Sequence, residues 1–299
     1  MSQTPLSLPQ PRKMGQTSRK DAWWLQPLVV FLGLSAFIIY ANWAAFQASN
    51  YEFGPYLSPM YSPLLFEAPT QAAINAEAHG ADVHVSHHSW LGSWPTALQP
   101  SWIPGWMLSP ALIILIFPAG FRLTCYYYRG AYYKAFWADP INCAVGEPRN
   151  SFRGENFWPL LIQNIHRYFF YAAAIYIFIL AYDAWVALWH VPADSLKSYN
   201  EAAAAGELEF GVGIGTLVLT LNVILLGGYT FGCHCARHLV GGKHDHLSKL
   251  PTGKKPYECI SCLNRNHMKW AWTSLIWVGF TDFYIRMCAM NIWSDWRLF

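Results

Sequence analysis

The stretch YTFGCHCARHLVGG, Tyr229 to Gly242, decides how this chain is built, because a long apolar run stops there and metal-binding side chains follow. Two cysteines and two histidines fall within six residues, namely Cys233, His234, Cys235 and His238. Thiolates and imidazoles are the usual protein ligands of zinc, haem iron and iron–sulfur clusters. The stretch therefore predicts the end of a membrane-spanning helix that carries a metal or cofactor site.

The composition of the chain is that of a membrane protein. Of its 299 residues, 54% are hydrophobic and only 12% are charged, whereas roughly 25% are charged in an ordinary soluble domain. A helix needs about 20 mainly apolar residues to cross a bilayer. Five runs approach this length: 25–46, 106–128, 168–189, 210–232 and 270–293. We therefore expect an all-α integral membrane protein with five spanning helices, the second to the fifth forming a bundle.

The basic residues are distributed very unevenly along the chain. Sixteen of the 20 Lys and Arg residues lie before the first predicted helix, between the second and third, or between the fourth and fifth. Basic residues gather on the cytoplasmic side of membrane proteins, so the N-terminus is expected in the cytoplasm and the C-terminus outside. The predicted segments are a mobile tail at 1–20, a membrane domain at 21–299, an external loop at 47–101 and cytoplasmic loops at 129–166 and 233–268.

Seven cysteine and histidine side chains fall near the cytoplasmic ends of four predicted helices. Facing helices of a bundle are the usual place for a metal or cofactor site. From these residues alone, the site can hold zinc, a haem with histidine ligands, or a [2Fe–2S] cluster with two thiolates and two imidazoles. The candidate ligands are Cys125, His166, Cys233, His234, Cys235, His238 and His267.

The remaining cysteines and histidines carry weaker signals. Cys288 is alone in the outer half of the fifth helix and is expected to be a buried apolar side chain. Cys259 and Cys262 form a C-x2-C pair in a cytoplasmic loop, where reduced exposed thiols and a metal role fit the sequence equally well. Four histidines of the external loop are expected to be solvated: His79, His84, His87 and His88.

The glycine string GVGIG at 211–215 resembles a nucleotide-binding motif only superficially. Such a motif needs a preceding strand within a βαβ unit, which the surrounding sequence does not predict. Small residues also let helix backbones approach closely. We therefore expect these glycines to serve close packing at the start of the fourth helix.

Ionisable and phenolic side chains inside the predicted helices are a second functional signal. Asp282 and Arg286 are four residues apart, so they share one helix face and can form an ion pair, with Asp183 as a third member. Charges inside a bilayer are costly and are usually paired or functional. The alternative is a quinone pocket or a proton path. The candidate quinone-binding residues are Arg122, Tyr126, Asp183, Asp282, Tyr284 and Arg286.

Several motifs resemble those of one family. They are FRLTCYYYRGAYYKAFW at 121–137, NIHRYFFYAA at 164–173, CHCARHLVGG at 233–242, LNRNHMKWAW at 263–272 and TDFYI at 281–285. Together they resemble the membrane-anchor subunit of mycobacterial-type succinate dehydrogenase. In one place the chain departs from the family pattern Cys-His-Ser-Cys-Arg-His, since the second cysteine is Cys235 and Ala236 takes the expected cysteine position.

The resemblance implies a function and a cofactor. In that class the anchor is a single five-helix chain of the bacterial cytoplasmic membrane, free of haem and carrying a Rieske-type [2Fe–2S] cluster. The implied partners are the flavoprotein and iron–sulfur subunits that oxidise succinate, membrane lipid, and a quinone, expected to be menaquinone; no nucleic acid is implied. The chain would pass electrons to that quinone.

The resemblance also ranks the candidate ligands. Cys125 and Cys233 would be the thiolates and two of His166, His238 and His267 the imidazoles, with His234 and Cys235 in reserve. Two other classes of protein stay open on the residues alone. One is a haem-b quinol oxidoreductase subunit, and the other is a non-redox membrane scaffold that binds structural zinc.

Overall fold

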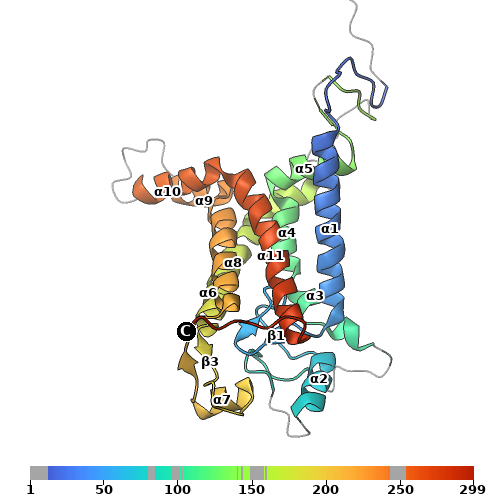
Figure 1. Ribbon diagram of the computed structural model, residues 1–299. Helices are drawn as coiled ribbons and strands as arrows, with labels where there is room; N and C mark the ends of the chain where they lie inside the picture. Colours follow the sequence, from blue (N-terminus) through green and yellow to red (C-terminus); the bar gives the residue numbers. More distant parts are fainter. Residues whose placement is uncertain are drawn as a thin grey trace, which may run out of the picture. The chain divides into compact units, whose positions relative to one another are not determined.

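The structure is a computed structural model, and it describes residues 13–79, 85–95, 102, 104–139, 141–142, 144–148, 158, 160–242 and 254–299. The chain divides into two compact units. The first consists of Met1–Ala36 and Arg122–His166, and the second of Phe37–Phe121 and Arg167–Phe299. Most described residues are helical, as expected, and the few strands are two residues long (Figure 1).

Helices cover all five predicted membrane runs. Four of the runs form one long helix each: α1 (Leu25–Gln47), α6 (His166–Val186), α8 (Ile214–Phe231) and α11 (His267–Ala289). The second run is divided into η2 (Gly105–Leu108), α3 (Ala111–Ile114), α4 (Ile116–Thr124) and α5 (Tyr126–Phe136). A 3-10 turn, η3 (Leu160–Ile165), leads directly into α6.

Fewer than five helices pass a test of length and hydropathy for crossing a membrane. Among the described residues three pass, within Leu25–Gln47, Leu161–Val186 and Ile214–Phe231. A fourth is gained if Ala111–Thr124 and Tyr126–Phe136 count as one bent span. α11 is 23 residues long but carries several charges and does not pass. A helical protein with several membrane spans is thus confirmed, whereas the count of five and the orientation of the termini stay predictions.

The second predicted run is not one continuous helix. Its prolines start helices instead of bending one, since Pro110 is the N-cap of α3 and Pro118 lies in the first turn of α4. The first N–H groups of a helix have no partner within it, so a missing N–H there costs little. The chain breaks again at Cys125, whose backbone is extended between α4 and α5. The predicted continuous helix to Tyr128 is therefore wrong, and a candidate ligand lies at the break.

In the first unit, the segment before α1 pairs with the loop that follows α5. Thr17 forms an antiparallel bridge with Val145, and Arg19 Nη1 donates to Asn142 Oδ1 at 2.9 Å. Part of the tail that was expected to be mobile therefore has fixed partners. Residues 1–12 of that tail lie outside the described residues.

In the second unit, the predicted external loop is a folded cap. It contains a hairpin of β1 (Glu52–Phe53) and β2 (Tyr56–Leu57), followed by α2 (Pro69–His79). The rings of Tyr51 and Tyr61 stack with their centroids 4.2 Å apart inside a buried cluster that includes the end of α1. Aromatic side chains bury large apolar areas, so this segment has enough apolar surface for a core of its own.

α8 and α11 pack side by side in the second unit (Figure 1). Trp277 Nε1 of α11 donates to the carbonyl oxygen of Val218 at 3.1 Å. Gly228 of α8 faces Trp270, and a Cβ placed on this glycine would lie 2.7 Å from the indole ring. The two helices are therefore close enough that only a glycine fits at this contact.

The start of α8 is enclosed by the end of the chain. Asp295 accepts hydrogen bonds from the Gly215 N–H at 2.8 Å and from the Tyr56 hydroxyl at 2.7 Å. A Cβ on Gly213 or Gly215 would come within 2.6 Å of Tyr56. Close packing at GVGIG is therefore confirmed, but the neighbour is Tyr56 of β2 and not the backbone of another helix. The adjoining elements are β3 (Trp189–His190), α7 (Tyr199–Ala205) and β4 (Glu209–Phe210), with β3 antiparallel to β4.

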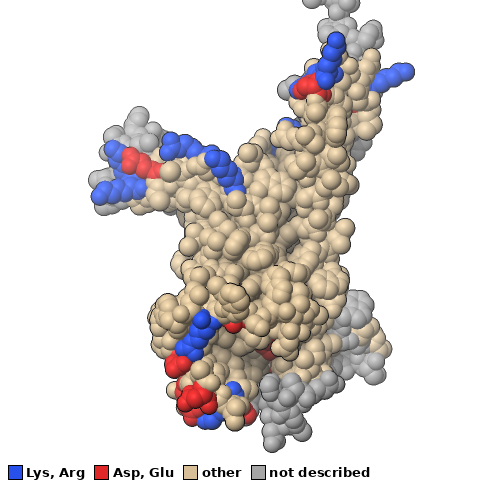
Figure 2. All heavy atoms as spheres, in the orientation of Figure 1, with Lys and Arg blue, Asp and Glu red and all other residues tan. Residues whose placement is uncertain are grey.

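Two shorter helices follow the other end of α8. They are α9 (His234–Gly241) and α10 (Lys254–Arg265), which pack against each other. Figure 2 shows mostly Lys and Arg side chains over α10 and both acidic and basic side chains over the region of α7, with an uncharged band along the helices between them. Exposed apolar residues such as Ile175 and Phe178 of α6 fit that band, because a lipid-facing helix surface is apolar.

Candidate cofactor site

The stretch that ends α8 forms a break between two helices. α8 ends at Phe231, and Cys233 is the N-cap of α9 with an extended backbone. Its Sγ accepts a hydrogen bond from the backbone N–H of Cys235 at 3.4 Å. The sulfur thus accepts the capping hydrogen bond that a serine hydroxyl usually accepts at the start of a helix. This cap brings the two thiol-bearing residues into one turn.

The surroundings of these two thiols differ. Cys233 is buried, whereas Cys235 is half-buried. The hydrogen bond with Cys233 lowers the pKa of the Cys235 thiol to about 7, helped by the positive charge of Arg167 and opposed by burial. Since the thiolate is the form that binds metals, the α9 turn offers sulfur in the required state near neutral pH.

The candidate histidine ligands of the second unit fall into two groups. His234 and His238 are exposed on α9, with their rings edge to face and 5.7 Å between centroids. His267, the first residue of α11, is half-buried and stacks on the ring of Tyr229 at 5.0 Å between centroids. Tyr229 is itself buried. His267 therefore has a fixed ring orientation that the two α9 histidines do not share.

The first unit holds the other two candidate ligands. Cys125 lies at the break between α4 and α5 and is 2% exposed. His166 begins α6, and its Nδ1 lies 2.8 Å from the Oγ1 of Thr124. Because Thr124 directly precedes Cys125 in the chain, this contact brings an imidazole and a thiol to the same helix break. Each unit thus presents both ligand types at helix ends.

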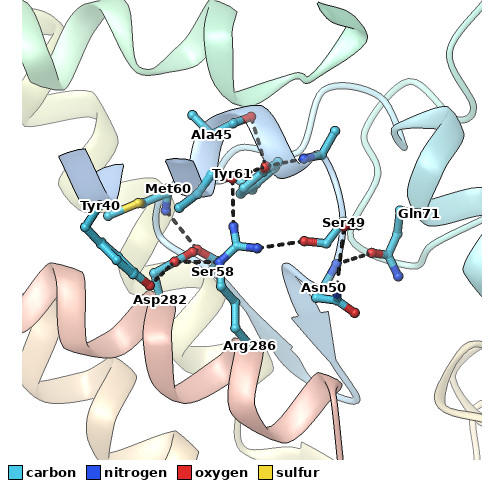
Figure 3. Close-up of polar contacts among 12 residues, drawn as sticks. Tyr40, Ala45, Ser49, Asn50, Ser58, Met60, Tyr61, Gln71, Asp282 and Arg286 are labelled. Atoms are coloured by element: carbon cyan, nitrogen blue, oxygen red, sulfur yellow. Dashed lines mark hydrogen bonds and ion pairs between the residues drawn. The ribbon is translucent and has the colours of Figure 1, made fainter. Parts of the chain in front are cut away.

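The predicted ion pair of α11 is confirmed (Figure 3). Arg286 Nε donates to Asp282 Oδ2 at 2.8 Å, and both side chains are completely buried. The guanidinium also donates to the carbonyl oxygens of Ser49 and Ala44 at 2.8 and 2.9 Å. The pair therefore ties α11 to the end of α1 and to the start of the cap.

The Asp282 carboxylate has further donors of its own. The Tyr40 hydroxyl donates to Oδ2 at 2.6 Å, and the Ser58 hydroxyl donates to Oδ1. Asp183 is not a third member of this group, because its carboxylate accepts a hydrogen bond from Ser62. The expected three-membered ion cluster is corrected accordingly. Sequence reasoning could not find these partners, since Tyr and Ser at those positions carry no pattern.

The other candidate quinone residues lie in separate local groups. The Tyr284 hydroxyl donates to Asp295 at 2.6 Å. In the first unit Arg122 Nη1 donates to the Tyr128 hydroxyl at 2.7 Å, whereas Tyr126 is 74% exposed. The polar partner of Tyr284 thus differs from those of the Asp282–Arg286 pair.

The remaining cysteines behave largely as expected. Cys288 is fully buried among apolar residues of α8 and α11, as predicted. Cys259 and Cys262 are exposed on α10, so they are available to solvent in this chain.

The external histidines need one correction. His88 is only 9% exposed, its Nε2 lies 3.1 Å from the carbonyl oxygen of Gly54, and its ring stacks on Tyr199. The expectation of a solvated residue is wrong for His88 because α7 covers the cap at this point. His87 is exposed as predicted. His84 and the side chain of His79 lie outside the described residues.

The comparisons with known proteins place the chain in a family. Residues 25–291 match the model of the actinobacterial succinate dehydrogenase subunit SdhC. The chain belongs to this SdhC family. It is a membrane subunit of an actinobacterial succinate dehydrogenase, and the predicted family is confirmed.

A solved structure supports the same assignment. The SdhC-family chain is similar to a chain of the Mycobacterium smegmatis Sdh1 complex in the apo form, with 38% sequence identity and a TM-score of 0.77. The similarity covers 99% of this chain and 97% of the other. None of the curated proteins compared with the chain matches it. Family membership and the apolar helices agree with a multi-pass protein of a bacterial membrane.

Proposed function

We propose that this SdhC-family chain anchors a succinate dehydrogenase in the membrane and passes electrons from its iron–sulfur subunit to a quinone through a Rieske-type [2Fe–2S] cluster. The observation that carries the proposal is the turn at Cys233, where one thiol caps a helix break and the thiol of Cys235, two residues further on, has a pKa lowered to about 7. Cys125 repeats the pattern of a thiol at a break. The donor set of thiols and imidazoles fits such a cluster.

The contacts of the histidine rings support a choice among the candidate imidazoles. His166 and His267 are half-buried, and each ring has a fixed neighbour, Thr124 and Tyr229 respectively. His234 and His238 are exposed on α9. A ligand that is already oriented loses less conformational freedom on binding, so we assign His166 and His267 as the imidazole ligands and keep the α9 histidines in reserve.

The thiolates come from the two buried cysteines, Cys125 and Cys233, with Cys235 in reserve. Their burial keeps water away from the bound group, and the lowered pKa of Cys235 fits a reserve thiolate ligand. When bound, the cluster supplies one-electron transfer, at a potential that imidazole ligands raise relative to thiolates alone. This chain's own residues hold and orient it.

The partners follow from charge and from the family. Lys254, Lys255 and Arg265 are exposed on α10, close in the chain to the cysteine turn (Figure 2). We assign this basic surface to docking of the iron–sulfur subunit, which in turn carries the flavoprotein subunit. Menaquinone is the proposed electron acceptor. The in-chain partners of Asp282 and Arg286 favour a structural role for that pair over a quinone pocket.

An electron paramagnetic resonance spectrum of the reduced, purified complex tests the cofactor. The expected result is a Rieske-like signal without a stoichiometric haem band in the optical spectrum. Cys233→Ser should abolish this signal and quinone reduction while the subunit still inserts. Cys288→Ser is the matched control, because that cysteine is equally buried but lies among apolar residues.

Three results would contradict the proposal. A haem band at one per complex would favour the haem-b class, and zinc without membrane-bound iron would favour the scaffold. A full signal in the Cys233→Ser complex would remove Cys233 from the ligand set.

A further inference from the structure

His166 is held by a side chain from the end of the preceding membrane helix. The Oγ1 of Thr124 and the Nδ1 of His166 lie 2.8 Å apart. Thr124 is the last residue of α4 and is 2% exposed, whereas His166 is the first residue of α6. The contact joins residues that are 42 positions apart in the chain. It is therefore a tertiary contact that no local pattern requires.

We propose that Thr124 positions His166 so that its Nε2, and not its Nδ1, is the nitrogen that binds iron. This inference rests on the proposed function. A neutral imidazole carries one N–H, and the metal takes the nitrogen without it. With Nδ1–H donating to the Thr124 hydroxyl, Nε2 is left as the ligand atom. Partners of this kind fix the tautomer and ring orientation of metal-bound histidines.

A threonine suits this position for two reasons. Its hydroxyl can accept the Nδ1 proton without bringing a charge into a buried site, where an unpaired charge is costly. Its branched Cβ also restricts χ1, so a buried threonine holds the hydroxyl in place. The peptide link to Cys125 then means that one helix break both orients an imidazole and supplies a thiol.

The second assigned imidazole is oriented in a different way. His267 stacks face to face on Tyr229, with 19° between the ring planes. The two imidazole ligands are therefore inequivalent: one is held by a hydroxyl contact and the other by a ring face. Removing the Thr124 hydroxyl should therefore change the nitrogen hyperfine couplings of His166 and leave those of His267 unchanged.

Thr124→Val tests the positioning role, because valine keeps the shape and removes the hydroxyl. In the whole purified complex, we expect cluster loss to a chelator to be roughly tenfold to a hundredfold faster, the usual effect of removing such a partner. One of the two sets of nitrogen hyperfine couplings should also change. Thr124→Ser keeps the hydroxyl and should restore both readouts to the wild-type values.

A second measurement needs no variant. Wild-type complex prepared with histidine labelled with ¹⁵N at Nε2 alone should show a strong ¹⁵N coupling to the reduced cluster from at least one ligand. Strong couplings from Nδ1 of both ligands would overturn the inference, as would a Thr124→Val complex with unchanged couplings and cluster retention. A wild-type complex without any membrane cluster signal would overturn the proposed function itself, and this inference with it.

Discussion

Arg286 donates to Asp282 at 2.8 Å from one turn further along α11, and neither side chain reaches solvent. The remaining guanidinium donors bind backbone carbonyl oxygens at the end of α1 and just beyond it (Figure 3). A buried ion pair is stable only when its other hydrogen-bonding groups are also satisfied. In this chain they are, and the pair joins α1, the cap and α11.

Breaking this pair should destabilise the subunit. Asp282→Asn leaves the Arg286 charge buried without its partner, which typically costs about 3–5 kcal/mol. We expect a lower unfolding temperature of the purified complex and equal losses of quinone reduction and of succinate oxidation by a soluble acceptor. The double variant Asp282→Leu with Arg286→Met should recover much of the stability, because no unpaired charge remains.

One outcome would reverse this interpretation. If Asp282→Asn leaves the unfolding temperature unchanged and slows only quinone reduction, the carboxylate belongs to a quinone or proton site. The structural role would then be wrong.

The stability of the cap should fall as the external pH rises. The carboxyl groups of Glu52 and Glu67 share two donor residues, Asn75 and Ser86. Burial raises the pKa of both groups, and the charge of Glu52 raises that of Glu67 further. No Lys or Arg occurs in residues 47–101 to offset these charges.

The sign of the pH dependence follows from the raised values. A group that binds its proton more tightly in the folded state contributes stability that is complete below its unfolded pKa of about 4.3. That contribution is lost as the pH rises through the folded-state pKa. Amide hydrogen exchange of the cap should therefore quicken from about pH 5 to pH 8, beyond the intrinsic rate increase, and Glu67→Gln should flatten the trend. Exchange that slows with rising pH, after correction for the intrinsic rate, would contradict the raised pKa values of Glu52 and Glu67.

Packing between α8 and α11 should depend on one of two adjacent glycines. A Cβ on Gly228 would lie 2.7 Å from the Trp270 ring, whereas one on Gly227 would have its nearest neighbour at 3.8 Å. Gly228→Ala should cost about 1–3 kcal/mol, as overpacking usually does, and Gly227→Ala should be close to neutral. Thermal unfolding of the two variant complexes makes the comparison. Equal effects would mean that the helices are not packed this closely.

The orientation of the chain can be tested with reporter fusions. The uneven distribution of basic residues predicts that a reporter after Phe299 is external and that one inserted after Lys254 is cytoplasmic. An alkaline phosphatase fusion should be active only at the first position, and a green fluorescent protein fusion should fluoresce only at the second. The reverse pattern would separate the basic α10 surface from any cytoplasmic partner.

Local composition was sufficient to predict the membrane class and the positions of the long helices. The apolar runs at 168–189 and 210–232 coincide with α6 and α8 to within a few residues. Burial of Cys288 and close packing at GVGIG were also predicted correctly. These properties depend on the residues within each segment, because the bilayer acts on every segment in the same way.

Hydrogen-bond partners were decided only by the tertiary structure. The carbonyl oxygen that Arg286 binds on Ala44 is 242 residues away in the chain, and the Thr124 hydroxyl is 42 residues from His166. The break at Cys125 likewise interrupts a segment whose apolar composition gave no sign of an end. The sequence by itself thus determined which residues enter the membrane and which ligand types are present. Which imidazoles are oriented and which charges are neutralised depends on side chains from distant segments, because a hydrogen bond requires a matched distance and angle that composition does not encode.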